Sequence, residues 1–147
     1  MMDDEDRILT DALGAAGSLG GGSGGRAGAR FMAKRLRKNV LDLPLTLPAP
    51  PDAVAVHVTE LLAGLGNLLH TGSPTAPEAP RTLRAVVGGG FGGLNPVVVT
   101  VTLSAAGRPG EGTAVSVRGA AKEGLIKQRA GEKTARQVAS ELVRRVS

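Results

Sequence analysis

The sequence predicts an α+β domain of two layers, in which helices cover one face of a four-stranded antiparallel sheet. Hydrophobic residues occupy every second position over 97–104 and again over 113–119, which is the period of a half-buried strand. Ala135, Val138 and Leu142 then recur at the spacing of a helix. A hairpin followed by an amphipathic helix buries its apolar faces most simply when the helix packs on the hairpin.

The first strand is expected over 40–47, and the first long helix opens over 49–52 and ends near Leu65. Leucines alternate with polar residues or proline over 41–47. Pro44 has no amide hydrogen, so this strand should lie at an edge of the sheet. Pro50 and Pro51 suit the first turn of a helix, and Gly64 and Gly66 weaken its end.

The remaining elements complete the order β-α-β-β-β-α. Strands are expected over 82–87, 97–104 and 113–119, a connector over 121–128, and the closing helix over 130–146. Short connections between consecutive strands favour an antiparallel meander with both helices on one face. The wetter face would then carry Thr100, Thr102, Ser104, Ser116 and Arg118.

Residues 1–38 are expected to form an extension, and residues 39–147 a single α+β domain. Residues 3–13 suit a short acidic helix, 14–28 are mostly Gly, Ala and Ser as in a flexible linker, and 29–38 are basic. The basic stretch fits either a short helix on an anionic surface or a solvated linker. A helix as short as 3–13 is marginal alone in water and needs a partner surface, on its own domain or another chain.

Composition excludes several classes of site. The chain has 147 residues, a formal net charge of +5, no cysteine, and Phe31 and Phe91 as its only aromatic residues. Disulfides and thiolate metal sites are therefore impossible. No run of about 18 apolar residues predicts a membrane-spanning helix, and the acidic start does not resemble a signal peptide. A cytoplasmic location is expected.

Basic residues gather before and within the first turn of the closing helix. Because helix-start amides attract anions, an anion site is predicted there. The alternative is a solvated basic face. The predicted anion-binding residues are Arg118, Lys122, Lys127, Arg129 and Lys133.

A glycine-rich stretch lies between two predicted strands. Gly88, Gly90 and Gly93 have the spacing of a dinucleotide fingerprint, but a strand rather than a helix follows them, which argues against that function. The stretch suits a plain hairpin loop, or a flexible flap in which Phe91 folds over a ligand or partner.

No catalytic or metal constellation is present in the sequence. The two histidines, His57 and His70, have no serine or carboxylate at a telling spacing, and no further metal ligands cluster near them. The glutamates are scattered over predicted surfaces. No cofactor and no metal are expected, and enzymatic activity is not indicated.

One stretch resembles a known family. Residues 40–65 form a predicted strand, the run APPDAV at 49–54, and an apolar helix. This is similar to the opening of helix-grip proteins, the START and polyketide-cyclase-like superfamily, which also end in a long amphipathic helix gripped by a curved antiparallel sheet. The resemblance implies an apolar cavity under the last helix for a lipid-like or polycyclic ligand. The family usually has six or more strands and aromatic cavity linings, and no family site residue matches a position here.

The leading interpretation is a non-catalytic binding module that contacts an anionic partner through the basic surface near the last helix. The partner would be an acidic protein, a nucleic-acid backbone or a membrane surface. Sequence-specific recognition of single-stranded nucleic acid is not expected, because the chain has almost no aromatic residues to stack on bases. Two alternatives remain open, a helix-grip carrier of a small apolar molecule, and a structural protein that self-associates through a sheet edge or the N-terminal helix.

Overall fold

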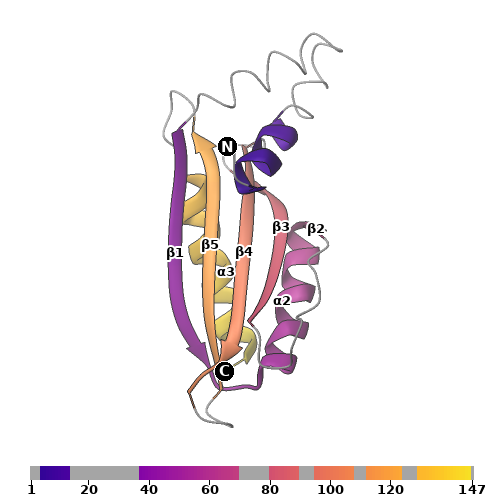
Figure 1. Cartoon of the computed structure of the whole chain (residues 1–147), viewed down its shortest axis with the longest axis vertical. Helices are drawn as coiled ribbons and strands as arrows, with labels where there is room; N and C mark the ends of the chain where they lie inside the picture. The colour runs from indigo at the N-terminus through magenta and orange to yellow at the C-terminus, as the bar shows by residue number, and fades with distance from the viewer. Residues whose placement is uncertain are drawn as a thin grey trace.

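The computed structural model describes residues 4–13, 37–69, 80–89, 95–107, 112–123 and 129–146. In this part of the chain, five strands form one antiparallel sheet in the order β1-β5-β4-β3-β2 (Figure 1). An N-terminal helix over 4–13 precedes the sheet. The other elements are β1 (Arg37–Leu47), α2 (Pro51–Leu65), β2 (Gly66–Leu69), β3 (Arg81–Gly89), β4 (Asn95–Ala105), β5 (Thr113–Glu123) and α3 (Ala130–Val146).

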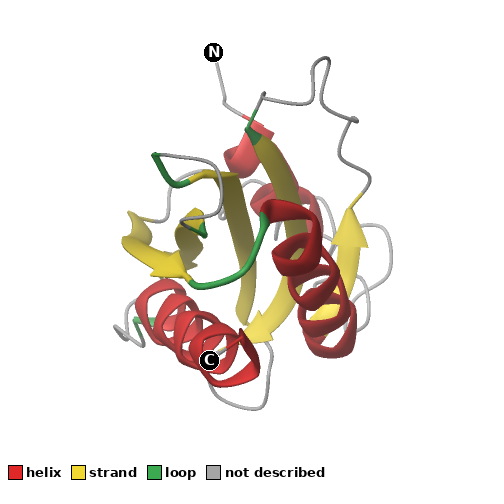
Figure 2. Cartoon of the chain, turned by 90° about the horizontal axis from the view of Figure 1, so that it is seen from below, coloured by secondary structure: helices red, strands yellow, loops and turns green. Residues whose placement is uncertain are grey.

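Helices α2 and α3 pack on the same face of the sheet (Figure 2), as predicted. Alternation along β4 directs Val97, Val99, Val101 and Leu103 into this core, where they are fully buried or nearly so. The helices contribute small and branched aliphatic side chains, with Val54, Val58 and Leu62 from α2 and Ala135, Val138 and Leu142 from α3.

The sheet has five strands and not the four that were predicted. The additional strand, β2, pairs with β3 through four residues directly after α2. Gly66 closes the helix, its amide donating to the carbonyl of Leu62, and opens the strand. A four-residue strand that follows a helix without a loop offers too little periodicity to be recognised.

Two strands are longer than predicted. β1 begins at Arg37, so Arg37 and Lys38 extend the sheet and are not part of a basic helix. β5 continues to Glu123, so the predicted connector begins with strand residues Ala121 and Lys122. These ends pair with each other, Arg37 opposite Glu123 and Lys38 opposite Lys122. The rest of the predicted linker and basic segment lies outside the described residues.

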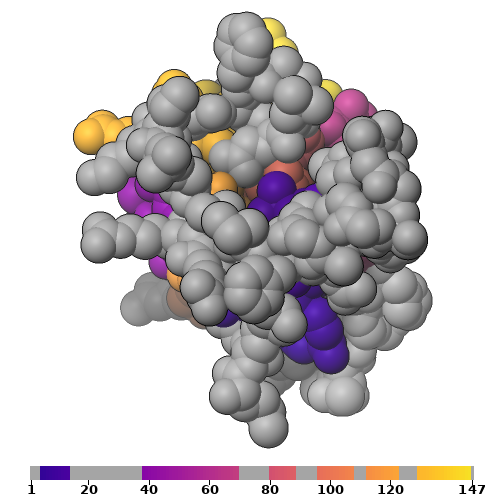
Figure 3. All heavy atoms as spheres, turned by 90° about the horizontal axis from the view of Figure 1, so that it is seen from above, coloured from indigo at the N-terminus to yellow at the C-terminus, as the bar shows by residue number. Residues whose placement is uncertain are grey.

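The N-terminal helix lies on the opposite face of the sheet from α2 and α3. In Figure 1 it is drawn in front of the sheet, with α3 behind, and in Figure 3 its atoms appear in indigo at the surface seen from above. Leu9, Val98 and Ala120 form a second, smaller cluster of buried side chains between this helix and the sheet. Helices therefore cover both faces, and the prediction of a single covered face holds only for α2 and α3.

The start of α3 approaches the sheet closely because two glycines face each other. A Cβ at Gly119 of β5 would lie 2.2 Å from the carbonyl oxygen of Gly131, and a Cβ at Gly131 would lie 2.4 Å from that of Asn39. The Asn39 side chain also accepts a hydrogen bond of 2.9 Å from the amide of Glu132. Asn39 thus satisfies one of the free amides in the first turn of α3.

Candidate functional site: the sheet face under the N-terminal helix

Alternation along β1 and β5 builds a basic frame around an apolar centre on the face opposite α2 and α3. The register places Lys38 opposite Lys122 and Val40 opposite Ala120. Arg118 lies two positions before Ala120 on β5, so its side chain is on the same face of the sheet. The three cations therefore surround a small aliphatic floor.

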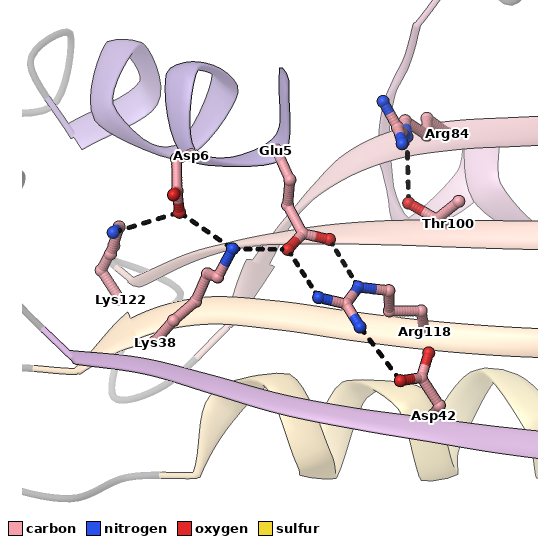
Figure 4. A network of polar contacts seen from close by, with 8 residues as sticks. All are labelled: Glu5, Asp6, Lys38, Asp42, Arg84, Thr100, Arg118 and Lys122. Carbon is pink, nitrogen blue, oxygen red and sulfur yellow. Dashed lines mark hydrogen bonds and ion pairs between the residues drawn. The ribbon is translucent and has the colours of Figure 1, made fainter. Parts of the chain in front are cut away.

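Glu5 of the N-terminal helix binds two of these cations (Figure 4). Its Oε2 lies 2.9 Å from Nε of Arg118 and its Oε1 lies 3.1 Å from Nη2 of the same guanidinium, which is a two-point contact. Oε1 also lies 3.0 Å from Nζ of Lys38. The paired, planar geometry orients the helix as well as attracting it.

Asp6 bridges the two lysines at the strand ends. Its Oδ1 lies 3.0 Å from Nζ of Lys38 and 3.2 Å from Nζ of Lys122. Lys38 thus contacts both acidic residues, and Lys122 is buried although it carries a charge. Because a buried ammonium group needs a counter-ion, the contact with Asp6 favours the buried position of Lys122.

Arg118 has a second carboxylate partner on the sheet itself. Its Nη1 donates to Oδ2 of Asp42 at 3.0 Å, on the neighbouring strand β1. Next to this network, Nε of Arg84 donates to Oγ1 of Thr100 at 3.1 Å (Figure 4). The predicted wetter face is thus partly covered, because Thr100 is buried and Arg118 is only partly exposed.

The electrostatics of the network favour the charged forms of all its acids and bases for which a shift is resolved. Burial alone would raise the pKa of Glu5, but hydrogen bonds from Arg118 and Lys38 outweigh it and lower the pKa. Burial also opposes ionisation of Asp6, whose pKa is nevertheless lowered by hydrogen bonds from Lys38 and Lys122. The pKa of Lys38 is raised, since its contacts with Asp6 and Glu5 exceed the opposing effect of burial. The hydrogen bond to Glu5 raises the pKa of Arg118.

The structure divides the predicted anion-binding residues between two places. Arg118 and Lys122 lie in the frame under the N-terminal helix. Arg129 and Lys133 are exposed at the start of α3, which packs on the other face of the sheet. Lys127 lies outside the described residues. The four described residues therefore do not form one surface, and anion binding at the start of α3 stays a prediction.

The predicted flap is described only at its first residue. Gly88 is exposed near the end of β3, opposite Pro96 of β4. Gly90, Phe91 and Gly93 lie outside the described residues, so the flap stays a prediction. β4 begins at Asn95, which agrees with the absence of a helix after the glycines.

Glu5, Asp6, Lys38 and Asp42 are the members of the site that the sequence analysis did not single out. The available signal was the short helix itself, which has acids at Glu5 and Asp6, an apolar residue at Leu9, and a need for a partner surface. In this structure that surface is the sheet of the same chain, and Leu9 is fully buried there.

Two grooves flank α3 on the other face. The first, of about 380 Å³, lies between β1 and α3 and is mostly apolar; its lining residues are Leu43, Pro44, Leu45, Ala139, Ser140 and Val143. The second, of about 270 Å³, lies between α2 and α3, and there Oε2 of Glu60 and Nη1 of Arg145 are 3.8 Å apart. In the described residues, no group of three or more His, Asp or Glu side chains is placed to hold a metal. No helix in the same residues has the length and apolarity needed to cross a membrane.

The sequence matches no protein-family model and no curated protein. Among solved structures, protein CV1439 from Chromobacterium violaceum is similar at 13% identity and a TM-score of 0.37, over 74% of this chain and 96% of that one. Ara h 8.0201 is similar at 11% identity and a TM-score of 0.34, over 75% and 98%. Zhui aromatase/cyclase from Streptomyces sp. R1128 is similar at 10% identity and a TM-score of 0.31, over 74% and 86%.

The predicted resemblance to helix-grip proteins stays a weak resemblance, because these likenesses have identities of 10–13% and TM-scores below 0.5. Likenesses at this level say nothing about what this chain binds.

Proposed function

We propose that this protein is a non-catalytic binding module whose sheet face binds an acidic, amphipathic helix of a protein partner. The observation that carries the proposal is the seating of residues 4–13, held by Glu5 and Asp6 against Arg118, Lys38 and Lys122. The anionic partner expected from the sequence is kept. We propose that this protein contacts the partner through the sheet face and not through the start of the last helix.

The chemistry of the face favours a helix over a phosphate chain. Ala120 lies between Arg118 and Lys122 on β5, with Val98 opposite it on β4, and both apolar side chains are fully buried in the cluster with Leu9. A phosphate backbone would pair with the cations but would leave this apolar floor exposed to water. A helix with acids on one turn and a leucine on the next satisfies both parts of the face at once.

The chain's own helix acts as an occupant that a partner must displace. A helix of this length is marginal in isolation, so its order depends on the contacts it makes with the sheet. A tethered segment also competes at an effective concentration of the order of millimolar. The partner helix must therefore bind more tightly, or the ion pairs of the N-terminal helix must first be weakened.

The test is to offer the face a free helix. A full-length receptor carrying Glu5→Lys and Leu9→Asp has its own helix disabled, and a labelled peptide of residues 1–13 is titrated into it. We expect saturable binding that weakens as salt is raised from about 50 to 200 mM, because the contacts are charged. The same receptor with Arg118→Glu added should bind at least about tenfold more weakly.

Two controls fix the interpretation. A peptide carrying Glu5→Lys should not bind the receptor, and Arg136→Glu on the exposed side of α3 should leave peptide binding unchanged. Binding that ignores Arg118→Glu, or no binding at low salt by a receptor that retains its fold by circular dichroism, refutes the proposal.

A second candidate function is supported by the groove between β1 and α3. Its volume of about 380 Å³ exceeds the roughly 300 Å³ that a small-molecule site needs, and Val143 at its rim is 47% exposed. The groove suits the expected small apolar ligand. Val143→Glu should abolish the fluorescence enhancement of an apolar dye bound there. The matched change Val56→Glu, at a valine of α2 that is also exposed (56%) and does not line this groove, should not.

A further inference from the structure

We infer that the sheet face of one copy of this chain also binds the N-terminal helix of a second copy, so that two chains exchange helices reciprocally. The inference rests on the proposed function, because it uses the same face and the same kind of occupant. It names the partner as a second molecule of this protein.

The contacts that seat the helix do not depend on which chain supplies it. Glu5 and Asp6 reach the sheet only through ion pairs and hydrogen bonds, and Leu9 reaches it only through packing. A second copy presents the same acids and the same leucine, so the exchanged arrangement forms an equal set of contacts. Reciprocal use of one patch on both chains gives a closed two-fold dimer that cannot grow into a filament.

Covalent reach permits the exchange. Residues 14–36 join the helix to β1, and a chain of that length spans up to roughly 80 Å at about 3.5 Å per residue. That limit exceeds the size of one domain, so the connection can serve either the same sheet or a neighbouring one. The choice is then governed by concentration, since the tether favours the same chain until the second copy approaches a millimolar level.

Charge complementarity allows the exchange to be forced at low concentration. All chains in the test carry Lys38→Gln and Asp42→Asn, because Lys38 also contacts Glu5 and Asp42 also contacts Arg118. On this background one variant carries Arg118→Glu and the other carries Glu5→Arg, so each repels its own helix. In a mixture, Glu5 of the first variant meets Arg118 of the second, and the introduced arginine meets the introduced glutamate. We expect each variant to be monomeric alone, and the equimolar mixture to form a dimer of one chain of each kind.

The measurement is native mass spectrometry at about 10–50 μM, supported by light scattering. The mixed dimer should exceed each like-with-like dimer by about tenfold or more. A single chain carrying both Glu5→Arg and Arg118→Glu is the matched control. It should seat its own helix again, seen as renewed hydrogen-exchange protection of residues 4–13, and stay monomeric at the same concentration.

The outcomes separate this inference from the proposed function. If the doubly substituted chain regains protection and the mixture stays monomeric, the exchange is refuted and the proposed function stands. If the doubly substituted chain remains unprotected while its core is folded, the ion pairs do not govern seating, and both fall. A second pair of variants, Lys122→Glu with Asp6→Lys, repeats the test should Arg118→Glu prevent folding.

Discussion

Arg118 is the residue on which seating of the N-terminal helix depends most directly. It makes a two-point contact with Glu5 and a third bond to Asp42, so it fixes the helix to the sheet and the sheet strands to each other. We expect Arg118→Ala to weaken seating by about 1–3 kcal/mol. Arg118→Lys should restore only part of this, because an ammonium cannot reproduce the planar fork.

Hydrogen exchange of the amides of residues 4–13 measures this effect separately from global unfolding. The control is Arg136→Ala, which removes only an exposed contact with Glu132 at 3.5 Å and should change stability by less than about 0.5 kcal/mol. Equal protection in the Arg118→Ala chain and the natural chain would contradict the assignment.

Acid should release the helix. The pKa values of Glu5 and Asp6 are lowered in the folded chain, so their contribution is complete above the unfolded values, near about 4. It is lost as the pH falls through the folded values. The raised pKa values of Lys38 and Arg118 act only at alkaline pH and do not affect this range.

Protection of residues 4–13 should therefore be complete above about pH 4 and fall as the pH is lowered further, while circular dichroism follows the core. Glu5→Gln should lower protection at neutral pH and flatten the acid dependence. Glu141→Gln is the control, because the lowered pKa of Glu141 arises from Arg144 on the same helix. A profile that does not change in the Glu5→Gln chain would refute the role of Glu5.

At the residue scale the sequence singled out two of the three cations, Arg118 and Lys122, and missed Lys38 and the carboxylate partners. Arg118 and Lys122 were singled out because excess positive charge lay near a helix start. Glu5 is 113 positions away from Arg118 in the chain, and no local pattern links positions that far apart. Only the need of a short amphipathic helix for a surface pointed to the contact.

Among the elements, α3 depends on close approach to β5. Gly119→Ala would place a Cβ 2.2 Å from the carbonyl oxygen of Gly131, so the helix must shift. We expect a loss of about 1–3 kcal/mol in the free energy of unfolding, the usual cost of overpacking. Denaturant unfolding followed by circular dichroism measures it.

Gly64→Ala is the matched substitution in α2. A Cβ there meets nothing within 4 Å, and replacing a helical glycine by alanine should add about 0.5–1 kcal/mol. Opposite signs for the two changes are expected. A neutral result at Gly119 would mean that α3 is seated less tightly than the glycine contact indicates.

Elements with a strong period were predictable, and elements fixed by contact with distant parts of the chain were not. The residues of α2 and α3 carry continuous 3.6-residue patterns, and the predicted end at Leu65 and span 130–146 agree with the structure. Pro44 correctly placed β1 at an edge. In contrast, β2 is too short to show a period. The last residues of β5, Lys122 and Glu123, are held in the strand by pairing with Lys38 and Arg37 of β1, which no local pattern indicates.

For the whole molecule, the exposed edge of β1 invites pairing with another chain. In the described residues β1 has β5 on one side and no strand on the other. Pro44 is exposed in the middle of this edge strand and interrupts its row of amides. We expect Pro44→Val to raise the average mass in light scattering at about 100 μM, with seating of the N-terminal helix unchanged.

Thr46→Val provides the comparison, because it raises strand propensity on the same strand without restoring an amide. An increase of mass in both variants would assign the effect to added hydrophobic surface and not to edge pairing. This route to association is separate from helix exchange, which is sensitive to salt and to Arg118.

The opposition of Lys38 and Lys122 across β1 and β5 gives the helix a role in the integrity of the sheet itself. Like charges that face each other on paired strands repel, and Asp6 is the counter-ion shared by both. Withdrawal of the helix would leave two ammonium groups confronting each other at the ends of the strands. The strand ends should then fray. Release of the helix over residues 4–13 would thus loosen the pairing of β1 and β5 on which the start of α3 packs.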